Sequence, residues 1–128
     1  MTEKKKVFGY ELLVDCYGCK PGVCDDIAVC YDFLDQIVPF IEMEKQGEPA
    51  VFRTDEERFP GKNGLSGWVP LAESSIVIHT LSLNDYISLD VYSCKEFDIN
   101  KVTDFVKKWF HPTNIDTQFV ERGTKYFD

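Results

Sequence analysis

The chain has 128 residues, of which 44% are hydrophobic and 28% charged, and its formal net charge is −8 at pH 7. This size and composition fit one globular domain with its own core, and no apolar run reaches the roughly 20 residues that a membrane span needs. The acidic excess argues against a nucleic-acid partner, because phosphate binding depends on clustered Lys and Arg. We therefore expect one domain over residues 1–128, with neither a nucleic-acid nor a membrane partner.

The first predicted elements are a strand and a helix. Residues 7–17, VFGYELLVDCY, favour a strand and are followed by the turn GCKPG. After them, apolar residues recur every three and four positions, which predicts an amphipathic helix to about residue 44 with Asp25 or Asp26 as its cap. Pro39 should kink this helix or end it early.

The middle of the chain predicts four strands. A short apolar segment, AVF, is followed by a long polar loop, and three further strands are read in LSGWVPLA, SIVIHTL and YISLDVYSC. Within the first of these three, Pro70 suggests an edge position or a bulge, because proline cannot donate to a neighbouring strand.

A second helix and a last strand complete the predicted order. Residues 98–110 carry an apolar stripe, with Asp98 or Asn100 as cap and His111 and Pro112 as the stop, and IDTQFVERG follows as a strand. The resulting order is β-α-β-β-β-β-α-β. It indicates an α+β fold, a two-layer sandwich in which two helices cover one face of an antiparallel sheet.

Five cysteines form an odd set that is too sparse for a disulfide framework, which favours free thiols in a reducing, cytoplasmic location. The N-terminal segment agrees, because Glu11 and Asp15 interrupt its apolar part and make it a poor signal peptide. The motif CYGC could indicate a redox or zinc site, but a turn rather than a helix follows it. We favour buried free thiols for Cys16, Cys19, Cys24 and Cys30.

The stretch LAESSIVIHT places polar residues inside an apolar strand pattern. Ser74 and His79 could form a nucleophile and a base, but residues five apart on one strand point to opposite faces. A bend at the serine would be needed to bring them together. The alternative is a polar turn that enters a strand, with a histidine that is merely hydrogen-bonded.

Several motifs together resemble the short prokaryotic S-adenosylmethionine decarboxylases, a pyruvoyl-dependent family of polyamine and spermidine biosynthesis. The motifs are LLVDCYGC, GLSG, LAESSIVIHT, LDVYSC and VERGTKY. Their joint spacing is the most specific feature: Ser66 lies eight residues before Ser74, His79 five after it and Cys94 twenty after it. The likeness covers nearly the whole chain.

The resemblance implies a proenzyme that cleaves its own Glu73-Ser74 bond. The products would be a β-chain, residues 1–73, and an α-chain, residues 74–128, in which Ser74 has become a pyruvoyl group. This group would form a Schiff base with a substrate amine and take up the electrons freed as carbon dioxide leaves, so that no metal is needed.

The resemblance also implies roles for three other residues. His79 would remove the α-proton during elimination, and Ser66 would help in processing and orient groups near the new carbonyl. Cys94 would return a proton to the substrate, a step that suits a thiol because its pKa can be tuned. A homodimer with active sites near the subunit interface is implied as well.

Two departures from the family pattern concern the substrate. After the histidine the family usually reads HTWPEYGY, whose glutamate holds the ribose, whereas this chain reads HTLSLNDY with Leu83 in that place. Asp85 is a possible substitute. Phe59 would match the adenine-stacking phenylalanine only with one residue inserted after it. A third, local difference lies at the processing site, where Ser75 replaces a common histidine.

Three functions stay open. S-adenosylmethionine is the first expected substrate, and ornithine or arginine is the alternative, because family members with those activities lose the nucleoside contacts. Asp85, Glu56 or Glu57 could then meet the distal cation of the substrate. The third option is an unprocessed, catalytically silent paralogue that regulates a partner.

Overall fold

The computed structural model describes residues 5–128 of the chain. Two short 3-10 turns, η1 (Val23–Asp25) and η2 (Ser82–Asn84), precede the first helix and the fifth strand. The strands and helices are β1 (Gly9–Tyr17), α1 (Ile27–Phe40), β2 (Ala50–Thr54), β3 (Gly64–Leu71), β4 (Ser74–Leu81), β5 (Tyr86–Ser93), α2 (Ile99–Phe110) and β6 (Asn114–Arg122).

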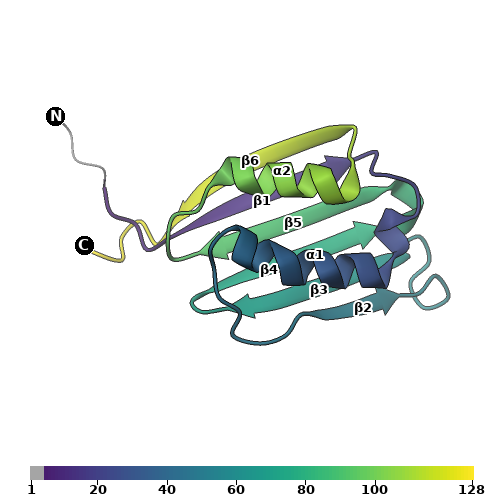
Figure 1. Cartoon of the computed structure of the whole chain (residues 1–128), viewed down its shortest axis with the longest axis horizontal. Coiled ribbons are helices and arrows are strands. Elements are labelled where there is room, and N and C mark those ends of the chain that lie inside the picture. Colours follow the sequence, from purple (N-terminus) through teal and green to yellow (C-terminus); the bar gives the residue numbers. More distant parts are fainter. Residues whose placement is uncertain (1–4) are drawn as a thin grey trace.

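The six strands form one sheet in the order β2-β3-β4-β5-β1-β6, and all neighbouring strands are antiparallel. Both helices lie on the same face of this sheet, α1 over the half with β3 and α2 over the half with β1 (Figure 1). The predicted α+β two-layer sandwich is therefore confirmed. Within residues 5–128, no helix is long and apolar enough to cross a membrane.

The alternation of side chains along each strand separates the two faces of the sheet. On β4, Ile76 and Ile78 are buried under the helices, whereas Val77 is half-buried and His79 is exposed on the other face. The helices close the core through aromatic contacts, with the fully buried Phe33 of α1 against three rings of α2. Burial of each such large side chain contributes about 1.5 to 3 kcal/mol.

Helix α1 ends at Phe40, four residues before the predicted end at about residue 44. Pro39 lies in the last turn, and the helix ends in a Schellman-type cap: Glu42 has a left-handed φ of 61°, its amide donates to the carbonyl of Pro39, and the amide of Met43 donates to the carbonyl of Val38. The cap at the other end is Asp26, whose carboxylate accepts a hydrogen bond from the amide of Val29. For α2 the cap is Asp98.

Pro70 lies in β3, an interior strand, just beyond the end of its pairing with β2 at Trp68. On that side the carbonyl of Pro70 accepts a hydrogen bond from Gln46, and Leu71 forms an isolated bridge with Lys45. Pro70 is therefore at a break in the ladder rather than at an edge of the sheet, and the pairing of β3 with β4 is uninterrupted.

Candidate active site

The Glu73-Ser74 bond lies at a tight hairpin. Leu71 of β3 pairs with Ser74 of β4, so only Ala72 and Glu73 form the turn. Glu73 has a φ of 59°, in the left-handed region that favours glycine and that costs another residue about 1 to 3 kcal/mol. The bond predicted to break is therefore held in strained backbone rather than in a free loop.

Ser74 and Ser75 point to opposite faces of β4. Ser74 shares its parity with the buried Ile76, and its hydroxyl donates a hydrogen bond to Ser93 Oγ at 3.0 Å. Ser75 faces the side of the sheet that carries no helix, opposite Tyr92 of β5. This difference supports Ser74 rather than Ser75 as the reactive serine.

A cavity of about 300 Å³ lies beside Ser74, between the end of the sheet and the segment that follows α1. At its wall, the ammonium of Lys95 donates a hydrogen bond to the carbonyl oxygen of Glu42 at 2.6 Å. The lining residues are Glu42, Met43, Glu44, Ala72, Ser74, Ser93, Cys94 and Lys95. The cavity thus combines the serine, a thiol and a cation at one end of the sheet.

Cys94 follows the last residue of β5 and contacts the turn. Its Sγ lies 3.1 Å from Glu73 Oε2. The hydrogen bond to this carboxylate raises the pKa of the Cys94 thiol, and partial burial adds to the effect. A raised pKa keeps the thiol protonated at neutral pH, which is the form that a proton donor requires.

The other two predicted catalytic residues form a separate pair. Ser66 Oγ and His79 Nδ1 are 3.1 Å apart, and the two residues are direct neighbours on β3 and β4. His79 lies five residues along β4 from Ser74, about 16 Å at the rise of a strand, and on the opposite face. No bend interrupts β4, so one chain does not bring His79 to Ser74.

The residues predicted to contact substrate also lie at the far end of β4. Leu83, in η2, is 70% exposed, and Phe59 sits half-exposed in the 55–63 loop beneath the guanidinium of Arg58. The amide of Ser82 donates to the carbonyl of Asn63, which joins these two loops. Both loops are therefore separated from Ser74 by the length of the strand.

Asp85 shares this end of the sheet. It adopts a left-handed φ of 49°, and its carbonyl accepts a hydrogen bond from the amide of Cys19 at 2.9 Å. The carboxylate that could replace the missing ribose-binding glutamate is thus carried by a turn whose backbone is tied to the segment after β1.

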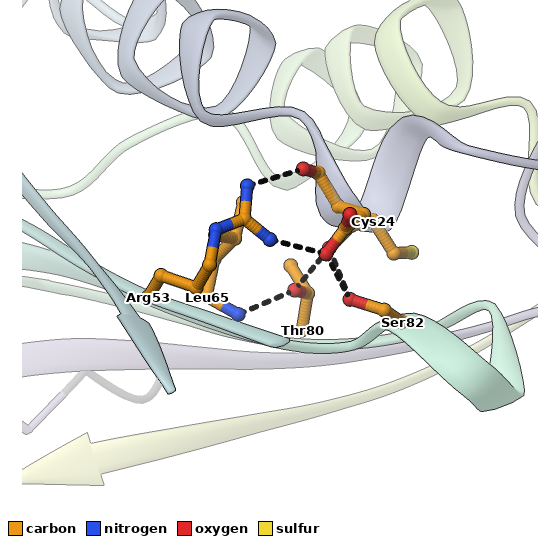
Figure 2. A network of polar contacts seen from close by, with 6 residues as sticks. Cys24, Arg53, Leu65, Thr80 and Ser82 are labelled. Carbon is orange, nitrogen blue, oxygen red and sulfur yellow. Dashed lines mark hydrogen bonds and ion pairs between the residues drawn. The ribbon is translucent and has the colours of Figure 1, made fainter. Parts of the chain in front are cut away.

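A polar network fixes the loops at this end of the sheet (Figure 2). The carbonyl of Cys24 accepts from the hydroxyls of Thr80 at 2.5 Å and Ser82 at 3.2 Å, and Thr80 Oγ1 accepts from the amide of Leu65. The Asp25 carboxylate binds Arg53 and Ser82. Its pKa lies below the ordinary value because Ser82 and Arg53 stabilise the charge. Five elements (η1, β2, β3, β4 and η2) are joined here, which gives the loops at this end of the sheet a rigid base.

Four of the five cysteines are buried free thiols, as predicted. Cys19 lies between Cys16 and Cys24, and hydrogen bonds from these two thiols lower its pKa. Burial raises the pKa of Cys30 to about 12. Among residues 5–128, no group of three or more His, Cys, Asp or Glu side chains is arranged to hold a metal ion.

Two features of the site were missed by sequence reasoning. Ser93 is completely buried and contacts Ser74, but a serine next to a cysteine carries no signal by itself. A hollow of about 490 Å³ on the uncovered face is lined by Asp15, Asp90 and Asp116. These aspartates come from three strands, and only the strand order brings them together.

Comparison with known proteins agrees with the site. The sequence model of S-adenosylmethionine decarboxylase matches residues 10–123. Together with the fold, this match makes the chain a decarboxylase, that is, a carboxy-lyase.

The relatives make the assignment more specific. The S-adenosylmethionine decarboxylase proenzyme of Pyrococcus abyssi is 32% identical over 94% of this chain and 82% of that protein. The proenzyme of Persephonella marina is 30% identical over 94% of this chain and 86% of that protein. The adenosylmethionine decarboxylase structure from Aquifex aeolicus superimposes with a TM-score of 0.76 at 27% identity, with 92% of each chain covered. The chain belongs to the S-adenosylmethionine decarboxylase family.

Proposed function

We propose that the chain is a self-processing, pyruvoyl-dependent decarboxylase that acts on S-adenosylmethionine. The observation that carries this proposal is the strained two-residue turn at Glu73, with Ser74 directed into a cavity beside Cys94. The choice of S-adenosylmethionine as the substrate rests on the relatives named above, which are proenzymes of S-adenosylmethionine decarboxylase. The five free cysteines favour a reducing, cytoplasmic location.

The first step of processing would be attack of Ser74 Oγ on the carbonyl carbon of Glu73. A carbon–oxygen bond forms, the Glu73-Ser74 carbon–nitrogen bond breaks, and the hydroxyl proton passes to the freed amine. The left-handed backbone of Glu73 favours this step, because strain stored in the peptide is released when the bond breaks. Removal of the α-proton of Ser74 then expels the Glu73 carboxylate, ends the β-chain at residue 73 and leaves a dehydroalanine at residue 74. This group tautomerises to an imine, which water hydrolyses to the pyruvoyl group with release of ammonia.

The surroundings of Ser74 fit the resulting pyruvoyl group. Ser74 begins β4 at the edge of a cavity of about 300 Å³, so the group would stand at a chain terminus with room for a small substrate. When bound to substrate, a pyruvoyl group supplies an electron sink for decarboxylation. Cys94 is the proton donor we propose, because it lines the same cavity as Ser74 and a thiol of ordinary pKa is protonated at neutral pH.

We propose further that two copies complete each active site. Within one chain, the Ser66 and His79 pair lies about 16 Å from Ser74 along β4, on the face that no helix covers. An antiparallel pairing of two such faces places the Ser66 and His79 end of each copy beside the Ser74 end of the other. Exposed Phe52 and Trp68 on this face would be buried by a homodimer.

The decisive test is the mass of the purified chain after long incubation. We expect two fragments divided between Glu73 and Ser74, with a blocked N-terminus on the α-chain, and no cleavage in Ser74→Ala. Ser75→Ala should cleave as the wild type does. A wild-type chain that stays intact would instead support the silent regulatory paralogue, and cleavage in Ser74→Ala would overturn the assignment of the serine.

A second substrate class is favoured by one observation. Leu83 is 70% exposed and cannot accept a hydrogen bond from ribose, and three aspartates line the hollow over β5, β1 and β6 on the uncovered face. Ornithine or arginine would need such carboxylates and no nucleoside pocket. Release of carbon dioxide from S-adenosylmethionine, ornithine and arginine, measured side by side on the processed protein, decides between them.

A further inference from the structure

Ser93 is a buried hydroxyl in direct contact with the atom that must react. Its side chain is 1% exposed, and its Oγ lies 3.0 Å from Ser74 Oγ across the β4 and β5 pair. Buried hydroxyls are hydrogen-bonded, and Ser93 Oγ accepts from the amide of Lys95, a turn contact that accounts for a hydroxyl here but not for its second contact with Ser74. The neighbouring inward positions of β5, Ile87, Leu89 and Val91, are all apolar.

The hydrogen bonds of Ser93 leave its own proton available. A serine hydroxyl has two acceptor positions and one donor. Ser93 Oγ accepts from Ser74 Oγ and from the amide of Lys95 at 3.1 Å, so both acceptor positions are filled. Its own proton is thus left for a third atom, and Ser93 lines the cavity beside Ser74.

The other polar groups near Ser74 are engaged elsewhere. The Glu73 carboxylate contacts the thiol of Cys94, and the ammonium of Lys95 donates to the carbonyl of Glu42. The imidazole of His79 faces the other side of the sheet. Among the described residues, Ser93 is thus the one whose side chain contacts the hydroxyl of Ser74.

We propose that Ser93 is the proton-relay residue of the acyl shift that begins self-cleavage, an inference that rests on the processing proposed above. As Ser74 Oγ bonds to the Glu73 carbonyl carbon, its proton passes to Ser93 Oγ. The proton of Ser93 passes to the nitrogen of Ser74 as the carbon–nitrogen bond breaks. Ser93 ends the step as it began, and no other reactant is consumed.

Ser93 and His79 would act on different steps of self-processing. Ser93 acts on the protons of the Ser74 hydroxyl and amine that move during ester formation. His79, supplied by a second copy, would act on the α-proton, which leaves only in the later elimination. The two residues therefore affect different steps, and a reagent that intercepts the ester can separate them.

The experiment measures cleavage of the full-length chain with and without hydroxylamine, which splits an ester between Glu73 and Ser74 but not the peptide bond. We expect Ser93→Ala to slow both spontaneous and hydroxylamine-dependent cleavage about 100-fold, the range of general acid–base catalysis. Ser93→Thr keeps the hydroxyl, and the adjoining cavity has room for its methyl group. It should cleave within about threefold of the wild type.

Two control variants separate a relay from loss of structure. Thr80→Val removes another buried hydroxyl, at the opposite end of β4, so it should lower stability but leave the cleavage rate unchanged. His79→Ala should lose spontaneous cleavage but retain hydroxylamine-dependent cleavage, because its ester still forms. Thermal unfolding of each variant shows that the chains compared are folded.

Four results would overturn the inference. Wild-type cleavage rates in Ser93→Ala would show that the contact has no role, and rapid hydroxylamine cleavage of Ser93→Ala would place Ser93 after the acyl shift. If Thr80→Val lost cleavage to the same extent, lower folding stability alone would explain the loss in Ser93→Ala. A wild-type chain that never cleaves overturns the proposed function itself, and this inference with it.

Discussion

At the scale of single residues, Glu73 combines three properties that no local pattern reveals together. It precedes the bond predicted to break, its φ of 59° strains that bond, and its carboxylate lies 3.1 Å from the Cys94 thiol. Before cleavage, this carboxylate keeps the thiol protonated. After cleavage, Glu73 is a chain terminus and can move away, so the environment of Cys94 should change when the enzyme matures.

The coupling of Glu73 to Cys94 predicts a change in thiol reactivity. A neighbouring negative charge disfavours the thiolate, so Glu73→Gln should lower the pKa of Cys94 and let the thiolate form at lower pH. The pH dependence of iodoacetamide alkylation, measured in an uncleaved Ser74→Ala background, reports this pKa directly. We expect the alkylation curve to move to lower pH.

A matched control is Glu44→Gln, which removes another carboxylate that lines the same cavity. It should leave the alkylation curve of Cys94 in place. The four buried cysteines should react slowly at every pH. An identical curve in Glu73→Gln and in the Ser74→Ala background would contradict the assigned cause of the raised pKa.

At the scale of secondary structure elements, the residues of the motif GLSG serve two purposes: the glycines allow close packing, and the serine carries a reactive group. A Cβ on Gly64 would lie 1.9 Å from the backbone carbonyl oxygen of Thr80 on the neighbouring strand. A Cβ on Gly67 would lie 2.9 Å from methyl groups of Ile78 and Leu34, where α1 packs on the sheet. Both glycines are thus required by close approach, and Ser66 alone of these residues carries a reactive group.

The two glycines should differ in their tolerance of alanine. Gly64→Ala meets backbone atoms, which cannot rotate away, whereas Gly67→Ala meets the ends of side chains that can adjust. Overpacking typically costs about 1 to 3 kcal/mol, so we expect about 1 kcal/mol for Gly67→Ala and about 3 kcal/mol for Gly64→Ala. Urea unfolding in the Ser74→Ala background measures both, and equal losses would contradict this reading of the contacts.

At the scale of the whole molecule, the sheet holds apart two groups of residues that the proposed self-cleavage needs close together. The Ser74 cavity and the Ser66 and His79 pair lie at different positions along β4 and on opposite faces. A straight strand of eight residues cannot fold back on itself. In the homodimer proposed above, a second copy in the reverse orientation would bring its Ser66 and His79 pair to the end of the sheet that carries Ser74 of its partner.

Complementation between two inactive variants tests this arrangement. When chains carrying Ser74→Ala and His79→Ala are produced together, a mixed dimer contains one intact serine and, on the other chain, one intact histidine. We expect cleavage only of the His79→Ala chain, and only in the mixture. Intact mass spectrometry of the separate and combined chains provides the measurement.

The control for complementation replaces the Ser74→Ala chain by a chain with both substitutions. No mixed dimer then contains an intact histidine, so no cleavage should occur. Failure of the first mixture to cleave, despite demonstrated mixed dimers, would contradict a shared site. Cleavage of the His79→Ala chain alone would show that His79 is not the base.

Much of the fold could be predicted from periodicity. Alternation along SIVIHTL and YISLDVYSC identified strands, because one face of each is buried, and the three- and four-residue spacing identified both helices. The apolar stripe that placed the end of α1 at about residue 44 continues past its last residue, Phe40, whereas Pro39 correctly indicated an earlier end. Local pattern marks which side chains are buried, but only backbone hydrogen bonding determines where a helix ends.

The sequence by itself determined the family, the order of elements and the candidate residues Ser66, Ser74, His79 and Cys94, because reactive residue types at fixed spacings survive as a linear pattern. Only the tertiary structure decided which of them meet. The pairing of β4 with β5 sets Ser74 against Ser93, and that of β3 with β4 sets Ser66 against His79. Strand register is a property of two segments far apart in the chain, so no stretch of sequence contains it.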